Sequence, residues 1–118
     1  MSAKKEFTKT LDKFRLERLR VKLTIDKGNL IDIVFQYESF INEKWTEIVR
    51  YDFAHGFFHR DFINPKGEKE KVHIEINDMT MAATFAEQDI IDKWEFYKTK
   101  YLQKLKNNDK KRNYKKKY

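Results

Sequence analysis

The sequence predicts an α+β fold with a short N-terminal helix, a curled five-stranded antiparallel meander, and a long C-terminal helix packed on the sheet. Between residues 18 and 76, apolar and polar residues alternate in short runs separated by turn residues, which is typical of half-buried strands. After residue 84, apolar residues recur instead at helical spacing. Because the apolar face of a sheet needs a cover, we expect this helix to lie across it.

The start of the chain carries a helical pattern that gives way to a hairpin. Ser2 can cap a helix over residues 3–15, whose apolar side chains are spaced to form one stripe. From residue 18 the period changes to two, which predicts a strand over residues 18–25. The tetrapeptide DKGN joins it to a second strand over residues 30–38, because glycine adopts a positive φ at little cost in such a turn.

Three further strands complete the predicted meander. They are expected over residues 41–52, 57–63 and 70–76, and the turn NPKGE joins the last two. In the first of these strands, Trp45 and Tyr51 are separated by an even number of positions, so we expect them to share one face. Short connections between consecutive strands favour antiparallel pairing throughout.

The C-terminal helix has recognisable start and stop signals. Thr84 and Glu87 form a capping-box pattern, acidic residues fill the first turns and lysines fill the last. The sequence leaves open whether the preceding DMTMAA segment begins this helix or forms a separate turn. The helix carries more aromatic side chains than one core can bury, Phe96 above all, which favours a homodimer or another protein partner.

The length of 118 residues is that of one domain with a single core. We expect the domain to span residues 1–106 and a disordered or frayed basic tail to span residues 107–118. The chain has no cysteine, which excludes disulfides and thiolate chemistry and fits a reducing compartment. No apolar run reaches the roughly 20 residues of a membrane span, and the first residues carry charges where a signal peptide is apolar. We therefore expect a cytoplasmic protein with no membrane partner.

The net charge of +7 comes from the end of the chain. Residues 104–118 hold eight Lys or Arg and one Asp, so the rest of the chain is neutral. A polybasic tail can bind RNA or DNA by neutralising phosphates, or it can serve only to keep the protein in solution. Arg18, Arg20 and Lys22 form a second basic stripe, which we interpret as a charged edge strand that resists edge pairing. The candidate nucleic-acid-binding residues of the tail are Lys110, Lys111, Arg112, Lys115, Lys116 and Lys117.

The segment RYDFAHGFFHRDF, residues 50–62, holds two of the three histidines of the chain together with Asp, Arg and Tyr side chains. A turn at HG brings two strands together, and its length decides whether Asp52 or Arg50 lies opposite His59. A tight hairpin at NPKG adds His73 close to the position opposite His59. We therefore expect imidazole, carboxylate and guanidinium groups to converge on one face of the sheet.

Three interpretations of this segment remain open. In the first, its polar residues form only a hydrated sheet face, where cross-strand pairs contribute about 0.2–1 kcal/mol each. In the second, the H-x3-H spacing belongs to a zinc site completed by Asp52 or Asp61, but so few histidines make this the least favoured, and we expect no metal or other cofactor. In the third, the segment cleaves RNA without a metal.

Metal-free RNA cleavage needs a base for the 2′-hydroxyl proton, an acid for the leaving oxygen, and a cation for the phosphorane charge. Histidine suits the first two roles because it titrates near neutral pH, and a neighbouring aspartate can orient it. The candidate residues are His55 and His59 as acid and base, Arg60 as phosphate ligand, Tyr51 and Asp52 in support, and Arg50 as a further contact to nucleic acid.

The segment RYDFAHGFFHRD and the helix AATFAEQDIIDKWEFYKTKYL resemble a family of small bacterial and archaeal proteins with an R-Y-D-x-A-H-G-x-x-H-R core. That core is similar to the toxin component of TumE-type toxin–antitoxin systems, written around R-Y-D-N-A-H. This chain departs from the toxin pattern at Phe53, where an Asn is expected, and at Asp61, where a histidine is expected. The resemblance implies a toxin-like, metal-independent ribonuclease and an antitoxin-like partner. A noncatalytic module that binds nucleic acid or a protein is the alternative. The matching positions are Arg50, Tyr51, Asp52, His55, Gly56, His59 and Arg60.

Overall fold

The computed structural model describes the backbone of residues 2–116 and the side chains as far as residue 109. Six strands precede a single long helix, with a short 3-10 turn, η1, between the fourth and fifth strands. In chain order the elements are β1 (Ser2–Thr10), β2 (Glu17–Asp26), β3 (Asn29–Ile41), β4 (Lys44–Asp52), η1 (Ala54–Gly56), β5 (His59–Ile63), β6 (Lys69–His73) and α1 (Met79–Lys116).

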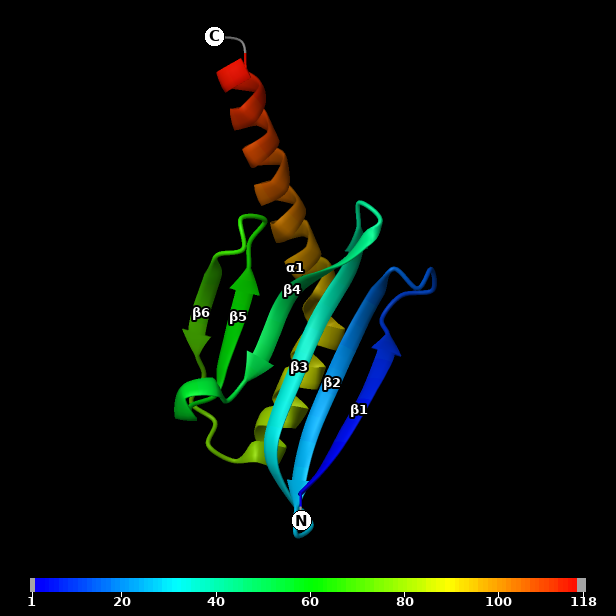
Figure 1. Cartoon of the computed structure of the whole chain (residues 1–118), viewed down its shortest axis with the longest axis vertical. Coiled ribbons are helices and arrows are strands. Elements are labelled where there is room, and N and C mark those ends of the chain that lie inside the picture. Colours follow the sequence, from blue (N-terminus) through cyan, green and yellow to red (C-terminus); the bar gives the residue numbers. More distant parts are fainter. Residues whose placement is uncertain (1, 117–118) are drawn as a thin grey trace.

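The six strands form one antiparallel sheet in which every strand lies beside its neighbour in the sequence, in the order β1-β2-β3-β4-β5-β6 (Figure 1). Helix α1 crosses one face of this sheet and packs mainly on β3 and β4. The predicted α+β class, the antiparallel meander and the covering helix are therefore confirmed. The predicted number of strands and the predicted N-terminal helix are wrong.

The expected N-terminal helix over residues 3–15 is wrong, because this segment contains strand β1. β1 pairs with β2 in unbroken antiparallel register along its whole length. The strand satisfies backbone groups that would otherwise be unpaired on the edge of β2, and Phe7 packs partly against the core. Phe14 is 69 % exposed, whereas Phe7 and Leu11 pack partly against the core, so the three side chains do not form the expected single stripe. Six strands therefore replace the five expected.

Two-residue turns with positive φ at both positions join β2 to β3 and β3 to β4. The first consists of Lys27 (φ 51°) and Gly28 (φ 79°), at the DKGN sequence that predicts a hairpin. The second consists of Asn42 (φ 51°) and Glu43 (φ 65°) and contains no glycine that would predict it from the sequence. Turns of this kind match the twist of the flanking strands, so both hairpins are tight.

A β-bulge in β4 reverses the expected orientation of Trp45. The register between β3 and β4 shifts after Tyr37, which leaves Ile48 as an extra residue in β4. One extra residue changes the phase of the alternation along a strand. Trp45 consequently pairs with Phe40 on the face away from the helix, whereas Tyr51 points toward the helix. The prediction that Trp45 and Tyr51 share a face is wrong for this reason.

Helix α1 begins before the capping-box pattern. Its first residue is Met79, and the Asp78 carboxylate caps it by accepting a hydrogen bond from the Met81 amide (2.8 Å). Thr84 lies inside the helix, where its hydroxyl donates to the Thr80 carbonyl oxygen (3.1 Å), so of the two alternatives that the sequence leaves open, the DMTMAA segment begins the helix. None of the helical segments that the structure describes combines the length and apolar character needed to cross a membrane.

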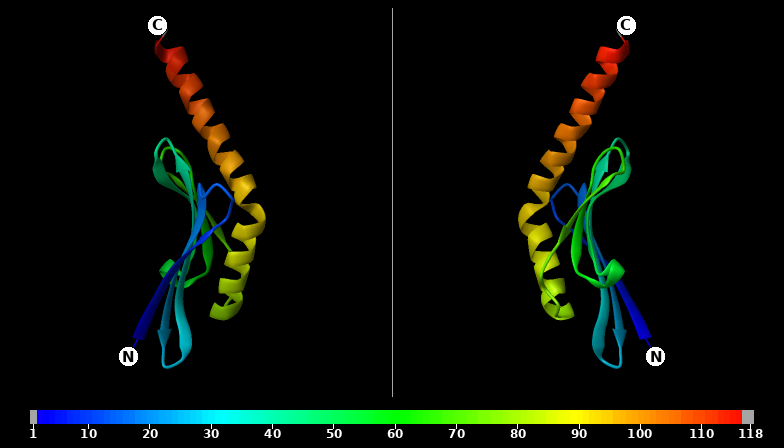
Figure 2. Two further views of the ribbon diagram at one scale, coloured as in Figure 1. Left: turned by 90° about the vertical axis from the view of Figure 1, so that its right-hand side faces the viewer. Right: turned by 90° about the vertical axis from the view of Figure 1, so that its left-hand side faces the viewer.

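The core lies between the helix and the sheet. Among residues 2–116, no element covers the other face of the sheet (Figure 2). We call that uncovered side the open face. Within the covered side, the Tyr37 hydroxyl donates to the Glu17 carboxylate (2.6 Å), which Lys98 of the helix also contacts. A ligand that meets the sheet broadside must therefore meet the open face. The buried apolar residues include Leu19, Val21, Ile33, Phe35, Val49, Phe58 and Phe62 from the sheet side and Ala82, Ala86, Ile90, Tyr97 and Tyr101 from the helix.

Candidate functional site

The RYDFAHGFFHRDF segment places its polar residues on both faces of the sheet. β4 and β5 pair so that Asp52 lies opposite His59 and Tyr51 lies opposite Arg60. This is one of the two registers that the sequence allows. Because side chains alternate along a strand, Asp52 and His59 belong to the open face, whereas Tyr51 and Arg60 point toward helix α1. The predicted site residues therefore divide into two clusters separated by the sheet itself.

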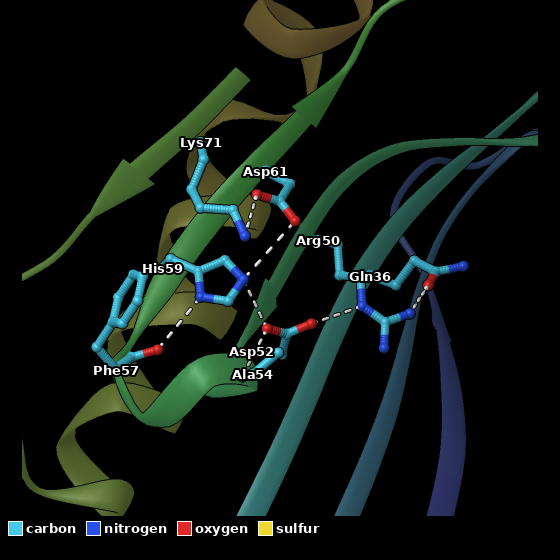
Figure 3. A network of polar contacts seen from close by, with 8 residues as sticks. All are labelled: Gln36, Arg50, Asp52, Ala54, Phe57, His59, Asp61 and Lys71. Atoms are coloured by element: carbon cyan, nitrogen blue, oxygen red, sulfur yellow. Dashed lines mark hydrogen bonds and ion pairs between the residues drawn. The ribbon is translucent and has the colours of Figure 1, made fainter. Parts of the chain in front are cut away.

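His59 is the centre of the open-face cluster, which consists of Arg50, Asp52, His59, Asp61 and Lys71 (Figure 3). Its Nε2 lies 2.7 Å from Asp52 Oδ1 and 3.7 Å from Asp61 Oδ2. Its Nδ1 lies 3.2 Å from the carbonyl oxygen of Phe57. The imidazole is thus held from both ring nitrogens, and only 1 % of the side chain is exposed. A ring buried to this degree has no surface to offer to a nucleic acid.

Asp52 connects this buried histidine to an arginine at the surface. Its Oδ2 accepts a hydrogen bond from Arg50 Nε (2.7 Å) and its Oδ1 accepts one from the Ala54 amide (3.0 Å). Burial raises the pKa of the Asp52 carboxyl, but the hydrogen bonds from Arg50 and Ala54 and the neighbouring His59 outweigh that effect and leave the pKa below its ordinary value. Asp52 is therefore ionised at neutral pH and fixes the Arg50 side chain from one side.

Asp61 and β6 complete the open-face cluster. Asp61 is buried, and its Oδ1 lies 3.9 Å from Lys71 Nζ without a hydrogen-bond partner. His73 lies opposite His59 in the sheet, as the hairpin at NPKG predicts. The ring of Phe57 lies against both imidazoles, with centroid distances of 5.3 Å to His59 and 4.7 Å to His73. The aromatic ring and Lys71 therefore help to shield His59 from solvent.

Tyr51 and Arg60 belong to a helix-face cluster with Asp89, Lys93 and Tyr97. The hydroxyls of Tyr51 (2.6 Å) and Tyr97 (2.5 Å) both donate to Asp89 Oδ2. Arg60 Nη1 donates to the Tyr97 hydroxyl (3.3 Å), and Lys93 Nζ lies 3.4 Å from Asp89 Oδ1. Burial and the hydrogen bond to Asp89 raise the pKa of Tyr97 to about 12, and the same causes raise the pKa of Tyr51 further. This cluster joins the helix to the sheet.

Sequence reasoning did not find Asp89. It lies on the helix, 38 positions after Tyr51, and a single Asp on an amphipathic helix is ordinarily solvated. The one available signal was its position beside Ile90 and one turn before Lys93, near the buried stripe of the helix. That signal indicates a partly buried carboxylate but names no partner for it.

His55 stands apart from both clusters. It belongs to η1, where it adopts a left-handed backbone (φ 68°) next to Gly56 (φ 85°). Its side chain is exposed and makes no hydrogen bond or ion pair within the described part of the chain. The structure therefore does not bring the candidate acid and base, His55 and His59, together.

The open face also carries a hollow of about 140 Å³, lined by Arg20, Lys22, Val34, Gln36 and Arg50. We call it the cationic hollow. Arg50 Nη1 donates to Gln36 Oε1 (3.2 Å), so the guanidinium is held between that amide and the Asp52 carboxylate (Figure 3). The interpretation of Arg20 and Lys22 as edge protection is wrong, because β2 lies inside the sheet between β1 and β3. Arg20 lies 3.5 Å from Glu38 and Lys22 lies 3.8 Å from Glu6, but both side chains are exposed enough to contact a ligand as well.

Two further expectations concern metals and the tail. Among residues 2–109, the structure contains no group of three His, Asp or Glu side chains arranged to hold a metal ion. Helix α1 continues into the segment for which a disordered or frayed tail is expected. The tail residues proposed to bind nucleic acid lie outside the described side chains, and the last lies outside the described residues altogether. They are Lys110, Lys111, Arg112, Lys115, Lys116 and Lys117.

The fold and the site define a small α+β protein with one helix-covered sheet face and one open face that carries a cationic hollow. The chain belongs to the family of the domain of unknown function DUF7718, whose model matches residues 1–107. The matched range includes the sheet and both clusters but ends before the basic tail. No curated protein and no solved structure matches the chain. The family description names no activity, so the resemblance to TumE-type toxins stays a prediction.

Proposed function

We propose that this protein binds RNA and that the cationic hollow on its open face receives a backbone phosphate. One observation carries the proposal: the lining of the hollow contains three cationic side chains, those of Arg20, Lys22 and Arg50, and no carboxylate. An anion placed there meets donors from three adjacent strands. Protein groups that contact nucleic acid most often do so through such phosphate contacts.

The hollow is prepared for an anion before any ligand arrives. Asp52 and Gln36 hold Arg50 from two sides, so its guanidinium loses little freedom on binding. Arg50 Nη2 has no partner among the described residues and remains able to donate. The side chains of Arg20 and Lys22 are 44 % and 56 % exposed, so both can adjust to a ligand. A charge-assisted hydrogen bond from Nη2 to a phosphate oxygen is the contact that we assign to Arg50.

A polyanion fits the whole chain better than an isolated phosphate. The net charge of +7 attracts nucleic acid at long range, and the candidate tail residues would add further phosphate contacts. The hollow lies on the open sheet face, where a long ligand meets no covering layer. The resemblance to TumE-type toxins favours RNA over DNA as that ligand.

The geometry gives less support to RNA cleavage than to RNA binding. Cleavage requires an acid and a base that reach the ribose and the leaving oxygen. His59 is 1 % exposed, His55 lies apart from it, and Arg60 points to the opposite face of the sheet. A protein partner also stays a proposal, with Phe96 (64 % exposed) as the expected contact of a homodimer or an antitoxin-like protein.

A binding measurement on the full chain tests the proposal. We would titrate a fluorescently labelled RNA of about 12 nucleotides between about 50 and 200 mM salt. The double variant Arg20→Gln/Lys22→Gln should bind more weakly and reduce the slope of log affinity against log salt by about 0.7, because the contact to one phosphate of a single strand is lost. The matched control, Lys27→Gln/Lys66→Gln, removes the same charge from two turns that do not line the hollow.

Three outcomes have a defined meaning. Equal weakening by the two double variants would show that net charge, not the hollow, binds RNA, and would remove the proposal. Truncation after residue 106 measures how much of the RNA affinity comes from the tail. If truncation abolishes binding and Arg20→Gln/Lys22→Gln has no effect, the proposal is also removed. Incubation of wild type and His59→Ala with RNA in EDTA tests cleavage. Equal cleavage by the two proteins, or none by wild type, would exclude cleavage that depends on His59.

A further inference from the structure

The open face carries two aromatic rings at the end of the sheet where β3 turns into β4. Phe40 and Trp45 face each other across the hairpin, with ring centroids 5.3 Å apart in an edge-to-face arrangement. Their side chains are 37 % and 36 % exposed. The guanidinium of Arg18 lies over the Trp45 ring, 3.8 Å from its centroid. We call these three side chains the aromatic shelf.

The backbone and a neighbouring carboxylate hold the aromatic shelf in place. The bulge at Ile48 brings Trp45 to the open face, as described above. Glu38 then fixes Arg18, because Glu38 Oε1 lies 2.7 Å from Arg18 Nε and 2.6 Å from Arg18 Nη2. An exposed tryptophan with a guanidinium stacked on it in a fixed position resembles the planar surfaces on which proteins stack unpaired bases.

The aromatic shelf and the cationic hollow lie along the same strands. Phe40 and Gln36 are four residues apart on β3, which corresponds to about 13 Å along the open face. Arg18 of the shelf and Arg20 of the hollow occupy consecutive open-face positions on β2. Glu38, the carboxylate between them, is already paired with both arginines, at 2.6 Å and 3.5 Å. A ligand that extends along β3 therefore meets rings at one end and cations at the other.

We infer that the ligand is single-stranded RNA, with an unpaired base stacked on the aromatic shelf while a phosphate of the same strand occupies the cationic hollow. This inference rests on the proposed function and goes further, because the cationic hollow alone accepts a phosphate from a duplex or from a single strand. A base inside a duplex has both ring faces covered by its neighbours and cannot stack on a side chain. The aromatic shelf therefore selects against duplexes.

The two tryptophans of the chain make the inference measurable. Trp94 packs against the core beside Tyr37, with ring centroids 6.3 Å apart, whereas Trp45 lies on the open face. Binding of the single-stranded RNA should quench part of the tryptophan emission in wild type. The quenching should vanish in Trp45→Phe, which keeps a ring for stacking, and persist in Trp94→Phe.

Affinity measurements give the second readout. Trp45→Ala should lower the affinity for single-stranded RNA by roughly 5- to 100-fold, the range found when one stacking ring is removed. A blunt-ended duplex of the same strand length, which has no unpaired base, should bind wild type more weakly than the single strand and should be insensitive to Trp45→Ala. Phe96→Ala serves as the control, because it removes an aromatic ring that is even more exposed than Trp45 but lies on helix α1, away from the shelf. Circular dichroism and the melting temperature establish that each variant is folded.

The outcomes separate this inference from the proposed function. If RNA binding depends on Arg20 and Lys22 but shows no quenching and no preference for single strands, the inference is overturned and the proposed function stands. If wild type binds neither the single strand nor the duplex, both the inference and the proposed function are overturned. If Trp45→Ala fails to fold, Trp45→Phe and Phe40→Ala supply the test, and unchanged emission of wild type on addition of single-stranded RNA still overturns the inference.

Discussion

The open-face cluster and the helix-face cluster arise from the same stretch of sequence but are built in different ways. In the open-face cluster, carboxylates surround a histidine and hold an arginine at the surface. In the helix-face cluster, two phenols donate to one buried carboxylate of the helix, and the hydrogen bond from Tyr51 crosses the boundary between sheet and helix. Neighbouring residues such as Asp52 and Tyr51 thus have unrelated roles. The comparison teaches that adjacent residues of a strand point to opposite faces of the sheet, so residues close in sequence can belong to different sites.

High pH should give the largest difference between the two clusters, because only the helix-face cluster contains phenols that can ionise. Below pH 10 the phenol of Tyr97 is protonated in the folded and the unfolded chain, so its contribution is constant. Above pH 10 it ionises in the unfolded chain, whereas in the folded protein its pKa is about 12. The stability contributed by Tyr97 is therefore lost between these values, by roughly 2–3 kcal/mol. Tyr51 and Tyr37, whose pKa values are raised further by burial, add to the loss.

We consequently expect the protein to unfold as the pH approaches 12. Phenolate absorbance and far-ultraviolet circular dichroism, recorded on the same samples, check this. The phenolate signal of the buried tyrosines should appear together with loss of secondary structure. Complete ionisation of all tyrosines near pH 10 with an intact dichroism spectrum would contradict the burial of the helix-face cluster.

Removal of Asp89 should give the largest effect of a single substitution. Asp89→Ala leaves the hydroxyls of Tyr51 and Tyr97 without their acceptor in a buried site, so we expect a loss of about 3–5 kcal/mol in the free energy of unfolding. Urea denaturation measures it. Asp92→Ala is the matched control, because Asp92 accepts only an exposed hydrogen bond from Gln88, and it should change stability by less than about 0.5 kcal/mol.

Removal of His59 should cost less, about 2–3 kcal/mol. His59→Ala leaves a cavity and exposes Asp52 and Asp61 to each other without the imidazole between them. His55→Asn, at a left-handed position that Asn tolerates, should stay within about 0.5 kcal/mol of wild type. Equal effects of the two substitutions in urea denaturation would show that the histidines are equivalent, contrary to the structure.

The sequence predicts those parts of the fold that local chemistry decides. Gly28 indicates the first hairpin, and alternation limits the partner of His59 to Asp52 or Arg50, of which the structure has Asp52. The turn at Asn42 and Glu43 has no glycine, and the lysines, glutamate and alanine of residues 3–15 are all compatible with a helix. That segment becomes a strand only because the edge of β2 is available to it, which is a tertiary effect.

The candidate site is less predictable than the fold for a related reason. The sequence correctly groups Asp52 with His59 and Arg50, which lie on one strand face. It cannot place Trp45, because the bulge that turns it over follows from the packing of two strands and has no local signature. The cationic hollow likewise depends on whether β2 is an edge or a central strand, and β1 decides that.

The connection between β4 and β5, residues 53–58, has a consequence for how this fold can vary. A slip of β5 against β4 by a single residue, which this loop must prevent, would exchange odd for even positions throughout β5. Asp61 would then face the core in place of Phe62, and Arg60 would move out to the solvent side. Members of the family that preserve both clusters should therefore keep Asp52 opposite His59, whatever the length of this loop.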